Sequence, residues 1–244
     1  MSAGRPVLPD WLEPVRKAAE TITADELSRF VPPEDAETRD GAVLMLFGEG
    51  PAGPDLLLTE RAHHMRSHPG QVSFPGGSID PTDVDPVAAA LREAEEETGL
   101  DPAGVEVFGT LPELWLPPSN FAVTTVLGWW REQTPVSVVD PDEVHQVLRV
   151  PIEELLDPAH RMTTVHPLGR VGPGFLIGPG RDVVLWGFTA GIISRLFEYV
   201  GWARDWDPEV TFELEDRMIF GSNKPTPLPP MPPPNTSFQE GPGQ

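Results

Sequence analysis

The sequence has no cysteine, one tyrosine and less than half as many basic as acidic residues. The absence of cysteine excludes disulfides and thiolate metal sites, and it is compatible with a cytoplasmic location. No apolar run approaches the ~18 residues that a membrane-spanning helix needs. The N-terminus, MSAGRPVLPDWLEPVRK, lacks the apolar stretch of a secretory signal. We therefore expect a soluble, cytoplasmic protein with no membrane partner.

The shortage of basic side chains gives the chain a formal net charge of −21, from 38 Asp and Glu against 17 Lys and Arg. Nucleic acids and anionic membranes repel such a protein, so we expect neither as a general partner. An anionic small-molecule substrate would need a local group of basic side chains or a bridging cation. The sequence contains candidates for both.

The chain of 244 residues is long enough for one substantial domain with extensions. Helical and strand-like patterns are mixed along the chain, so we expect an α/β protein with one main domain. We expect an N-terminal helical extension at residues 1–39 and the main domain at residues 40–205. A C-terminal extension follows at residues 206–244, and its proline-rich end lacks core residues, so we expect that end to be extended or disordered.

Several segments of the main domain have a clear secondary-structure pattern. A helix is predicted over residues 86–98, with Gly99 as its C-cap. Residues 143–156 predict a helix that is interrupted or entered near Pro151, and residues 183–200 begin as a strand and continue as an amphipathic helix. A buried strand is predicted at residues 41–47, and further strands are predicted at residues 56–60, 105–111 and 121–130.

The helix predicted at residues 86–98 carries a group of glutamates near its C-terminus. Glu93, Glu96 and Glu97 share one side of this helix, since their spacings are i, i+3 and i+4, whereas Glu95 points elsewhere. Like charges at these spacings repel one another, and carboxylates near a helix C-terminus also oppose the helix dipole. The three glutamates therefore lie together at an energetic cost.

Two explanations of this glutamate group are open. The plain one is a solvated polar face on a surface helix. The other is a cation site, because no Lys or Arg stands four residues after any of the three glutamates to relieve them. Carboxylate oxygens suit Mg²⁺ or Mn²⁺. We favour metal binding by Glu93, Glu96 and Glu97.

A basic patch, TERAHHMRSHPG, occupies residues 59–70 of this acidic chain. Arg61 and Arg66 have planar guanidinium groups suited to phosphate, although either alone could equally form an ordinary salt bridge. His68 is a candidate phosphate donor, whereas His63 and His64 receive no role, and we expect none of the three histidines to be a metal ligand. The patch is therefore a candidate substrate-binding segment.

Two glycines follow the basic patch. Gly76 and Gly77 come directly after Pro75, and a glycine pair lets the backbone approach a ligand or take a positive φ. An ordinary turn explains the pair equally well. We retain Gly76 and Gly77 as candidate substrate-binding residues.

The acidic helix resembles the Nudix signature, which runs Gly, five residues, Glu, seven residues, then R-E-(apolar)-x-E-E-x-G-(apolar). The segment REAEEETGL, residues 92–100, matches the second half at every fixed position. The first half differs. Counting from Gly77, Asp83 holds the position of the usual Glu, and one extra residue separates Asp83 from Arg92.

The basic patch resembles a second signature, L-L-T-x-R-[S/A]-x3-R-x3-G-x3-F-P-G-G, of the Nudix branch that hydrolyses coenzyme A. LLTERA at residues 57–62, Arg66, Gly70 and FPGG at residues 74–77 fill each fixed position. That branch also shares the longer spacing before Arg92. The similarity extends over residues 40–200.

The resemblance implies a Nudix fold, with a mixed β-sheet sandwiched between helices. It also implies Mg²⁺- or Mn²⁺-dependent hydrolysis of the pyrophosphate bond of coenzyme A or its derivatives. The products would be 3',5'-ADP and 4'-phosphopantetheine, or acyl-phosphopantetheine. Carried onto this chain, Glu93, Glu96 and Glu97 hold the metal, and any of them, Glu93 first, could instead orient the attacking water. Glu143 is a candidate catalytic base from a later loop, and Arg92 pairs with the carboxylates.

Two alternatives remain beside this hypothesis. The enzyme could act on another nucleoside diphosphate, such as ADP-ribose or NADH, or the Nudix fold could serve as a non-catalytic ligand-binding module. The sequence leaves the acyl preference, the role of the proline-rich tail and the choice between a monomer and a homodimer open.

Overall fold

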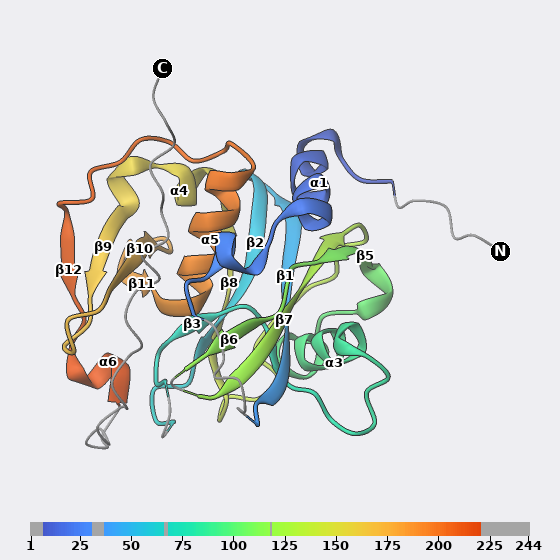
Figure 1. Ribbon diagram of the computed structural model, residues 1–244. Helices are drawn as coiled ribbons and strands as arrows, with labels where there is room; N and C mark the ends of the chain where they lie inside the picture. The colour runs from blue at the N-terminus through green and yellow to red at the C-terminus, as the bar shows by residue number, and fades with distance from the viewer. Residues whose placement is uncertain (1–6, 31–36, 66–67, 118, 221–244) are drawn as a thin grey trace.

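The structure is a computed structural model that describes residues 7–30, 37–65, 68–117 and 119–220. It contains a large mixed sheet with helices on both faces and a smaller second sheet beside it (Figure 1). This arrangement confirms the predicted α/β class. Arg66 and the proline-rich tail lie outside the described residues.

The large sheet has the strand order β3-β2-β1-β7-β5, with β4 also paired to β1, β6 to β7 and β8 to β2. The β1–β7 pair is parallel and every other pair in this sheet is antiparallel. The sheet is therefore mixed, as predicted. Its strands are β1 (Arg39–Gly50), β2 (Gly53–Arg61), β3 (Val72–Ser73), β4 (Gly76–Ser78), β5 (Val105–Thr110), β6 (Leu114–Leu116), β7 (Phe121–Trp130) and β8 (Val144–Pro151).

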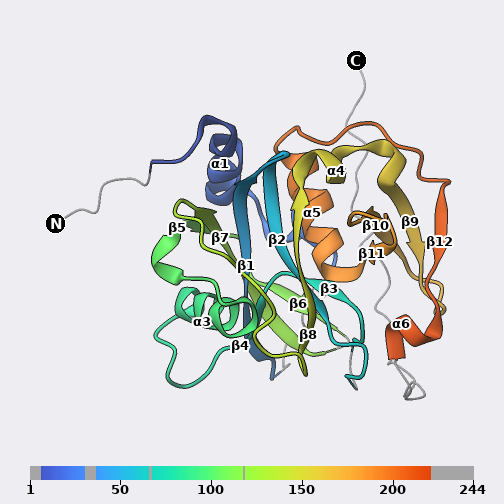
Figure 2. The same cartoon turned by 180° about the vertical axis from the view of Figure 1, so that it is seen from behind.

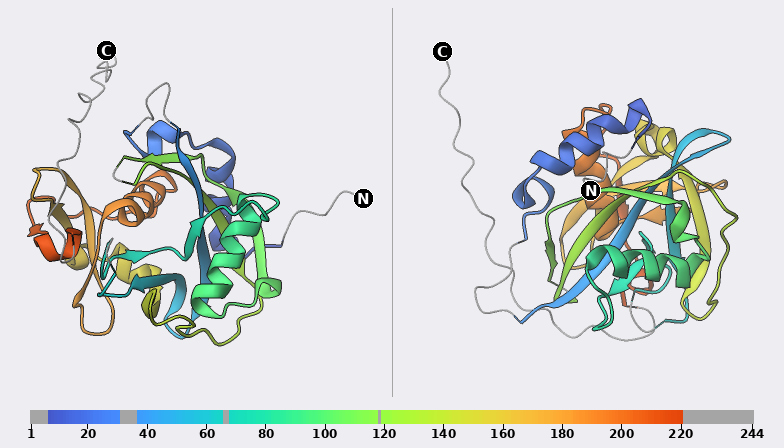
Figure 3. Two further views of the ribbon diagram at one scale, coloured as in Figure 1. Left: turned by 90° about the horizontal axis from the view of Figure 1, so that it is seen from below. Right: turned by 90° about the vertical axis from the view of Figure 1, so that its right-hand side faces the viewer.

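Two apolar clusters cover the two faces of this sheet. Along β1, Ala42, Leu44 and Leu46 pack in the cluster that includes α3 (Pro86–Thr98). Met45 and Phe47 pack in the other cluster, with α1 (Glu13–Thr21) and α5 (Gly187–Tyr199). This alternation is expected for a strand whose two faces are both buried. Figures 2 and 3 show α3 on the opposite side of the sheet from α5.

The second sheet has the order β11-β10-β9-β12, and its β9–β12 pair is parallel. The strand β12 and the helix α6 (Asp216–Phe220) come from the segment after residue 205. Leu214, just after β12, is buried. This segment is therefore part of the packed structure, up to residue 220. The strands are β9 (Arg161–Val165), β10 (Val171–Ile177), β11 (Val183–Leu185) and β12 (Thr211–Glu213).

The N-terminal segment consists of η1 (Asp10–Leu12), α1 and α2 (Ala24–Leu27). Leu12 and Val15 are fully buried in the core cluster that contains α5. At the start of α2, Thr23 forms a capping box with Glu26, which satisfies backbone N–H groups at the helix N-terminus. The N-terminal helices are therefore packed against the main domain.

The helix α3 has the bounds that its sequence predicts. The Asp85 side chain accepts a hydrogen bond from the Ala88 N–H, and Pro86 occupies the first turn. At the other end, Gly99 adopts φ +70°, and its N–H donates to the Glu95 carbonyl at 2.8 Å. These two caps fix the helix that carries the glutamate group.

The helix predicted over residues 143–156 is wrong for most of its length. Residues 144–151 form the strand β8, and only α4 (Ile152–Leu156) is helical. Val144, Leu148 and Val150 are buried and fit a two-residue period, and β8 pairs with residues 55–61 of β2. The pairing of these residues with the buried strand β2 therefore outweighs the helical pattern in their sequence.

The segment at residues 183–200 is confirmed as the strand β11 followed by α5. Two short 3₁₀ turns complete the described elements, η2 (Pro102–Gly104) and η3 (Pro158–His160). Within the described ranges, no helix combines the length and apolar character that crossing a bilayer requires.

Candidate active site

The buried end of the glutamate group lies against the Gly76–Gly77 segment. The Gly76 N–H donates a hydrogen bond to Oε2 of Glu97 at 3.3 Å. A side chain at position 76 would lie 2.4 Å from the Ala42 carbonyl oxygen, and Gly76 has φ +152°. Glycine is therefore required there for the backbone to reach both β1 and Glu97.

Gly77 leaves room for Glu93. A Cβ atom at position 77 would lie 2.6 Å from the Glu93 carboxyl group. Burial raises the pKa of Glu93, Arg92 counteracts this effect, and the charges of Glu96 and Glu143 add to it. The two glycines thus allow the chain after the basic patch to lie directly on the carboxylates of α3.

Glu97 is the most deeply placed carboxylate of the three, with 7% of the residue exposed. Burial raises its pKa to about 8, against the opposing effects of the Gly76 N–H and the Arg61 charge. Glu96 and Glu95 are exposed. Sequence correctly separated Glu95 from the other glutamates but gave no sign of which one is buried.

Arg92 holds part of the glutamate group. Its Nη1 donates to Glu93 at 3.1 Å and to Glu96 at 3.0 Å. The predicted pairing of Arg92 with the carboxylates is therefore confirmed. No basic residue stands four positions after any of the three glutamates, but Arg92 stands four positions before Glu96 and pairs with it from that side.

Asp83 is the residue whose part in the site the sequence analysis did not recognise. Its carboxylate accepts hydrogen bonds from Nε and Nη2 of Arg92 at 3.1 and 3.0 Å. These bonds lower the pKa of Asp83 and raise that of Arg92. The signal was present, because Asp83 occupies an acidic position of the Nudix signature, but no role had been assigned to it.

Arg61 lies at the end of β2, close enough to Glu97 to lower the pKa of its carboxyl group. The Nε atom of Arg61 is buried and has no hydrogen-bond partner among the described residues. A buried donor without a partner is costly, and an anionic ligand would satisfy it. This geometry fits the predicted phosphate-binding role of Arg61.

His68 lies beside Arg61 with φ +53°. Burial lowers its pKa, and the Arg61 charge lowers it further. Its buried Nδ1 atom has no partner within the described part of the chain. His68 is therefore neutral at physiological pH, and its Nδ1 is free to serve a ligand.

Glu143 is exposed in the turn before β8, and its carbonyl oxygen accepts a hydrogen bond from the Ala62 N–H at 2.8 Å. Its charge raises the pKa of both Glu93 and Glu97. The fold thus brings a residue about 50 positions away along the chain to the glutamate group. The candidate residues Arg61, His68, Gly76, Gly77, Glu93, Glu96, Glu97 and Glu143 are gathered at one site.

The carboxylates of this site suit a hard divalent cation. All three candidate ligands offer oxygen atoms, which Mg²⁺ and Mn²⁺ prefer. The raised pKa of Glu97 shows that Arg61 and the Gly76 N–H do not fully offset its burial. A cation beside Glu97 would supply the missing positive charge, so the residues present fit the group.

Comparison with known proteins identifies the family. The sequence model described as the NUDIX domain matches residues 37–167. The protein named uncharacterized Nudix hydrolase NudL from Escherichia coli O7:K1 is 40% identical over 192 residues, covering 74% of this chain and 96% of that protein. The protein of the same name from E. coli K12 is 39% identical over the same share of both chains.

Solved Nudix structures are also similar to the chain. A Nudix hydrolase from M. smegmatis, RenU, aligns at 20% identity with a TM-score of 0.48, over 69% of this chain and 89% of that one. The NUDIX domain of Shewanella oneidensis NrtR, solved with ADP ribose, aligns at 21% identity with a TM-score of 0.40, over 56% of this chain and 87% of that one. The family match over more than half of the chain, together with the similarity to NudL, shows that this protein belongs to the Nudix hydrolase family.

Proposed function

We propose that the protein hydrolyses the pyrophosphate bond of coenzyme A or its derivatives, with Mg²⁺ or Mn²⁺ held by Glu93, Glu96 and Glu97. The products are 3',5'-ADP and 4'-phosphopantetheine, or acyl-phosphopantetheine when the substrate is an acyl thioester. The substrate is a small molecule that carries a diphosphate and a separate 3'-phosphate. It needs a local positive region in a protein of net charge −21.

The relation between Arg61 and Glu97 supports this proposal most directly. Arg61 belongs to the segment that resembles the coenzyme A signature, and Glu97 belongs to the Nudix helix. The two are close enough for the arginine to lower the pKa of the carboxyl group. One phosphate can therefore lie between a guanidinium with a free buried Nε and the carboxylate group that holds the cation.

Different residues of the site bind the phosphates and accept the proton during hydrolysis. Arg61 binds a phosphate oxygen through its free Nε–H, and neutral His68 orients a second one. Water attacks one phosphorus, the bridging P–O bond breaks, and the proton of the water passes to a carboxylate. A divalent cation, when bound, screens the phosphate charge and makes the water more acidic.

Two carboxylates are candidates for the base that receives this proton. Glu93 is partly buried, and burial raises its pKa, which makes its carboxylate a stronger base. Glu143 is exposed in the turn before β8, and its charge acts on both Glu93 and Glu97. We favour Glu93, acting on the water instead of as a metal ligand, and keep Glu143 as the alternative base supplied by a loop.

The direct experiment is to incubate the protein with coenzyme A, ADP-ribose and NADH, each with Mg²⁺, Mn²⁺ or EDTA. We expect coenzyme A to be cut fastest, only with a metal, and the products to be 3',5'-ADP and 4'-phosphopantetheine by mass spectrometry. If another diphosphate is cut while coenzyme A stays intact, the substrate proposal is wrong. If no substrate is cut but one of them binds, the protein is a ligand-binding module.

A further inference from the structure

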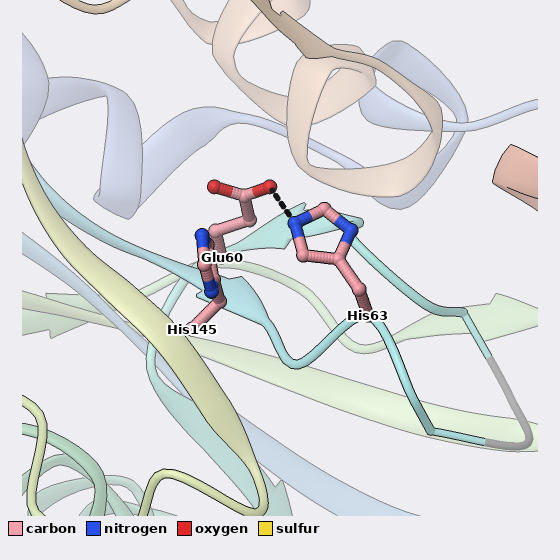
Figure 4. A group of neighbouring side chains, drawn as sticks. All are labelled: Glu60, His63 and His145. Atoms are coloured by element: carbon pink, nitrogen blue, oxygen red, sulfur yellow. Dashed lines mark ion pairs between the residues drawn. The ribbon is translucent and has the colours of Figure 1, made fainter.

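A second group of possible metal ligands lies at the start of the basic patch. Glu60 is the penultimate residue of β2, His63 stands in the turn that follows, and His145 is the second residue of β8. One ligand atom of each lies within 4.8 Å of the others. Figure 4 shows the carboxyl group of Glu60 and the two imidazoles directed toward a common space.

The carboxylate of this group is buried, and both of its oxygens are engaged. Glu60 is 6% exposed, and its Oε1 lies 3.1 Å from Nε2 of His63. Its Oε2 accepts a hydrogen bond from the Gln146 side-chain amide. Gln146 therefore fixes the orientation of the carboxyl group, as a supporting residue does for a metal ligand.

A β-bulge directs His145 toward this carboxylate. In the β2–β8 pair, Glu60 lies opposite Gln146 and Arg61 lies opposite Val144, so the register skips His145. A bulge changes the direction of the side chain that it carries, and bulges are frequent beside functional sites. The ring centroid of His145 lies 4.6 Å from that of His63, with the planes at 72°.

The turn that carries His63 is shaped around its ring. Gly70 has φ +66°, and a Cβ atom there would lie 2.8 Å from both Cε1 and Nδ1 of His63. The backbone at Gly70 therefore packs on one side of the imidazole, and its Nε2 faces Glu60. A larger residue at position 70 would displace the ring from this orientation.

We infer that Glu60, His63 and His145 form a second cation site, separate from the glutamates of α3, for a borderline transition metal such as Zn²⁺. Two imidazole nitrogens and one carboxylate oxygen are a common ligand set for Zn²⁺, with water completing the tetrahedron. Mg²⁺ prefers oxygen ligands, so it remains at the glutamates. The two sites therefore take different ions.

The spacing of the ligand atoms agrees with this ion. Ligands of a tetrahedral site with metal distances of about 2.0 Å lie about 3.3 Å apart. The Glu60–His63 distance of 3.1 Å is already near that value. His63 and His145 are exposed, so small rotations of their side chains can bring the third ligand to the same spacing.

A metal at this site would tie the basic patch to β8. It would join Glu60 in β2, His63 in the turn after β2, and His145 in β8. Ions at this site therefore stabilise the loop of the proposed substrate-binding segment. The inference itself concerns only metal binding and does not depend on the identity of the substrate.

Co²⁺ is a suitable probe, because its visible spectrum reports nitrogen ligands and tetrahedral geometry. The full-length protein, stripped with a chelator, is titrated with Co²⁺ in excess Mg²⁺, which keeps the glutamate site occupied. We expect one equivalent of Co²⁺ to bind with an intense tetrahedral spectrum and to be displaced by Zn²⁺. His63→Ala and His145→Ala should each weaken binding by at least about a hundredfold.

Two control variants make this test specific. His64→Ala removes a neighbouring histidine whose nearest acidic partner is Asp142, at 3.6 Å, and it should bind Co²⁺ like the wild type. Glu97→Gln alters the other site and should also leave the spectrum unchanged. Melting temperatures of the metal-free variants confirm that they are folded.

Two results would overturn the inference. One is unchanged Co²⁺ binding in both His63→Ala and His145→Ala. The other is loss of the tetrahedral spectrum in Glu97→Gln, which would place the ion at the glutamates. Because no substrate is present, either result leaves the hydrolysis proposal to its own experiment.

Discussion

Arg92 and Asp83 form an ion pair with two hydrogen bonds, and this pair fixes the guanidinium that also contacts Glu93 and Glu96. The Asp83 carboxylate is 6% exposed, whereas that of Glu96 is 60% exposed. The Asp83 carboxylate therefore neutralises much of the positive charge of the Arg92 guanidinium. The carboxylates of α3 remain available for a cation although an arginine lies among them.

Replacing Asp83 by Asn should therefore weaken metal binding. Without the charge of Asp83, Arg92 would form stronger ion pairs with Glu93 and Glu96. Its unneutralised positive charge would also repel the incoming cation. We expect the dissociation constant for Mn²⁺ to rise at least about tenfold, the usual effect of losing a residue that supports metal ligands. Isothermal titration calorimetry measures this change.

Asp80→Asn is the matched control for this variant. Asp80 lies 3.8 Å from the same guanidinium but is exposed, so its contribution is screened by solvent. We expect nearly wild-type affinity in Asp80→Asn. Equal effects of the two substitutions would mean that only the overall negative charge matters, and not the geometry of the Arg92–Asp83 pair.

Glu97→Gln should abolish turnover while the protein remains folded. The amide keeps an oxygen that can accept the hydrogen bond from Gly76, but it has no charge to hold a cation. We expect kcat to fall by more than about a thousandfold, since the reaction depends on the metal. Glu95→Gln, on the exposed side of the same helix, serves as the control. Wild-type rates in Glu97→Gln would exclude Glu97 as an essential ligand.

Metal stabilisation should increase with pH. The pKa of Glu97 is raised to about 8 in the folded protein from an ordinary value of 4.5. The folded, metal-free protein therefore holds a proton that the unfolded chain has lost, and this contribution to stability disappears as the pH rises through about 8. Above that pH, the buried carboxylate is charged and gains most from a cation. Below it, the cation must first displace the proton.

Thermal unfolding with and without Mn²⁺, at about pH 6 and about pH 8.5, measures this effect. We expect the metal to raise the melting temperature more at the higher pH. In Glu97→Gln the difference between the two pH values should largely vanish. A metal effect that is larger at the lower pH would contradict the assignment of the titrating group.

Arg66→Ala tests substrate recognition by the basic patch. If Arg66 binds the 3'-phosphate of coenzyme A, its loss should raise KM for coenzyme A about tenfold and leave KM for dephospho-coenzyme A nearly unchanged, since an arginine–phosphate contact contributes about 1.4 kcal/mol or more. Steady-state kinetics on the two substrates give the comparison. Arg131→Ala, in an exposed ion pair with Glu132, is the control. Equal rises for both substrates would remove this role from Arg66.

The parts of the fold that sequence predicted correctly are those whose signals are local. The helix α3 has an aspartate N-cap, a proline in its first turn and a glycine C-cap, and its bounds were predicted to the residue. The positions of Arg61 and Gly76 could be inferred from the spacing of the signatures. Local chemistry was sufficient for the helix, whereas the candidate roles of Arg61 and Gly76 came from the resemblance to the signatures.

The parts that sequence missed depend on contacts between distant segments. The strand β8 is held by pairing with β2, and the same pairing positions Glu143, which the family resemblance had suggested without placing it in space. The partnership of Arg92 and Asp83 depends on the path of the loop between them. The Glu60, His63 and His145 group needs a bulge in β8, which a residue pattern does not reveal.

The ion pair between Asp55 and Arg149 should contribute to stability far from the active site. Asp55 is 4% exposed, and Nη2 of Arg149 lies 2.8 Å from its Oδ2. Burial raises the pKa of Asp55, and Arg149 counteracts this effect. Arg149→Leu leaves a buried carboxylate without its partner, so we expect a loss of about 3 kcal/mol at neutral pH in urea unfolding. Arg131→Leu, which removes an exposed pair, should cost under about 1 kcal/mol.

The pH dependence of this loss separates charge from packing. In Arg149→Leu the pKa of Asp55 rises further, so the carboxyl group takes up a proton more readily as the pH falls, and protonation removes the unpaired charge. The destabilisation should therefore be smaller at about pH 5 than at neutral pH. The guanidinium also lies 5.0 Å from the Trp130 ring, and this contact does not titrate. An equal loss at both pH values would assign the effect to the Trp130 contact, and recovery of stability in Asp55→Asn/Arg149→Leu would assign it to the charge.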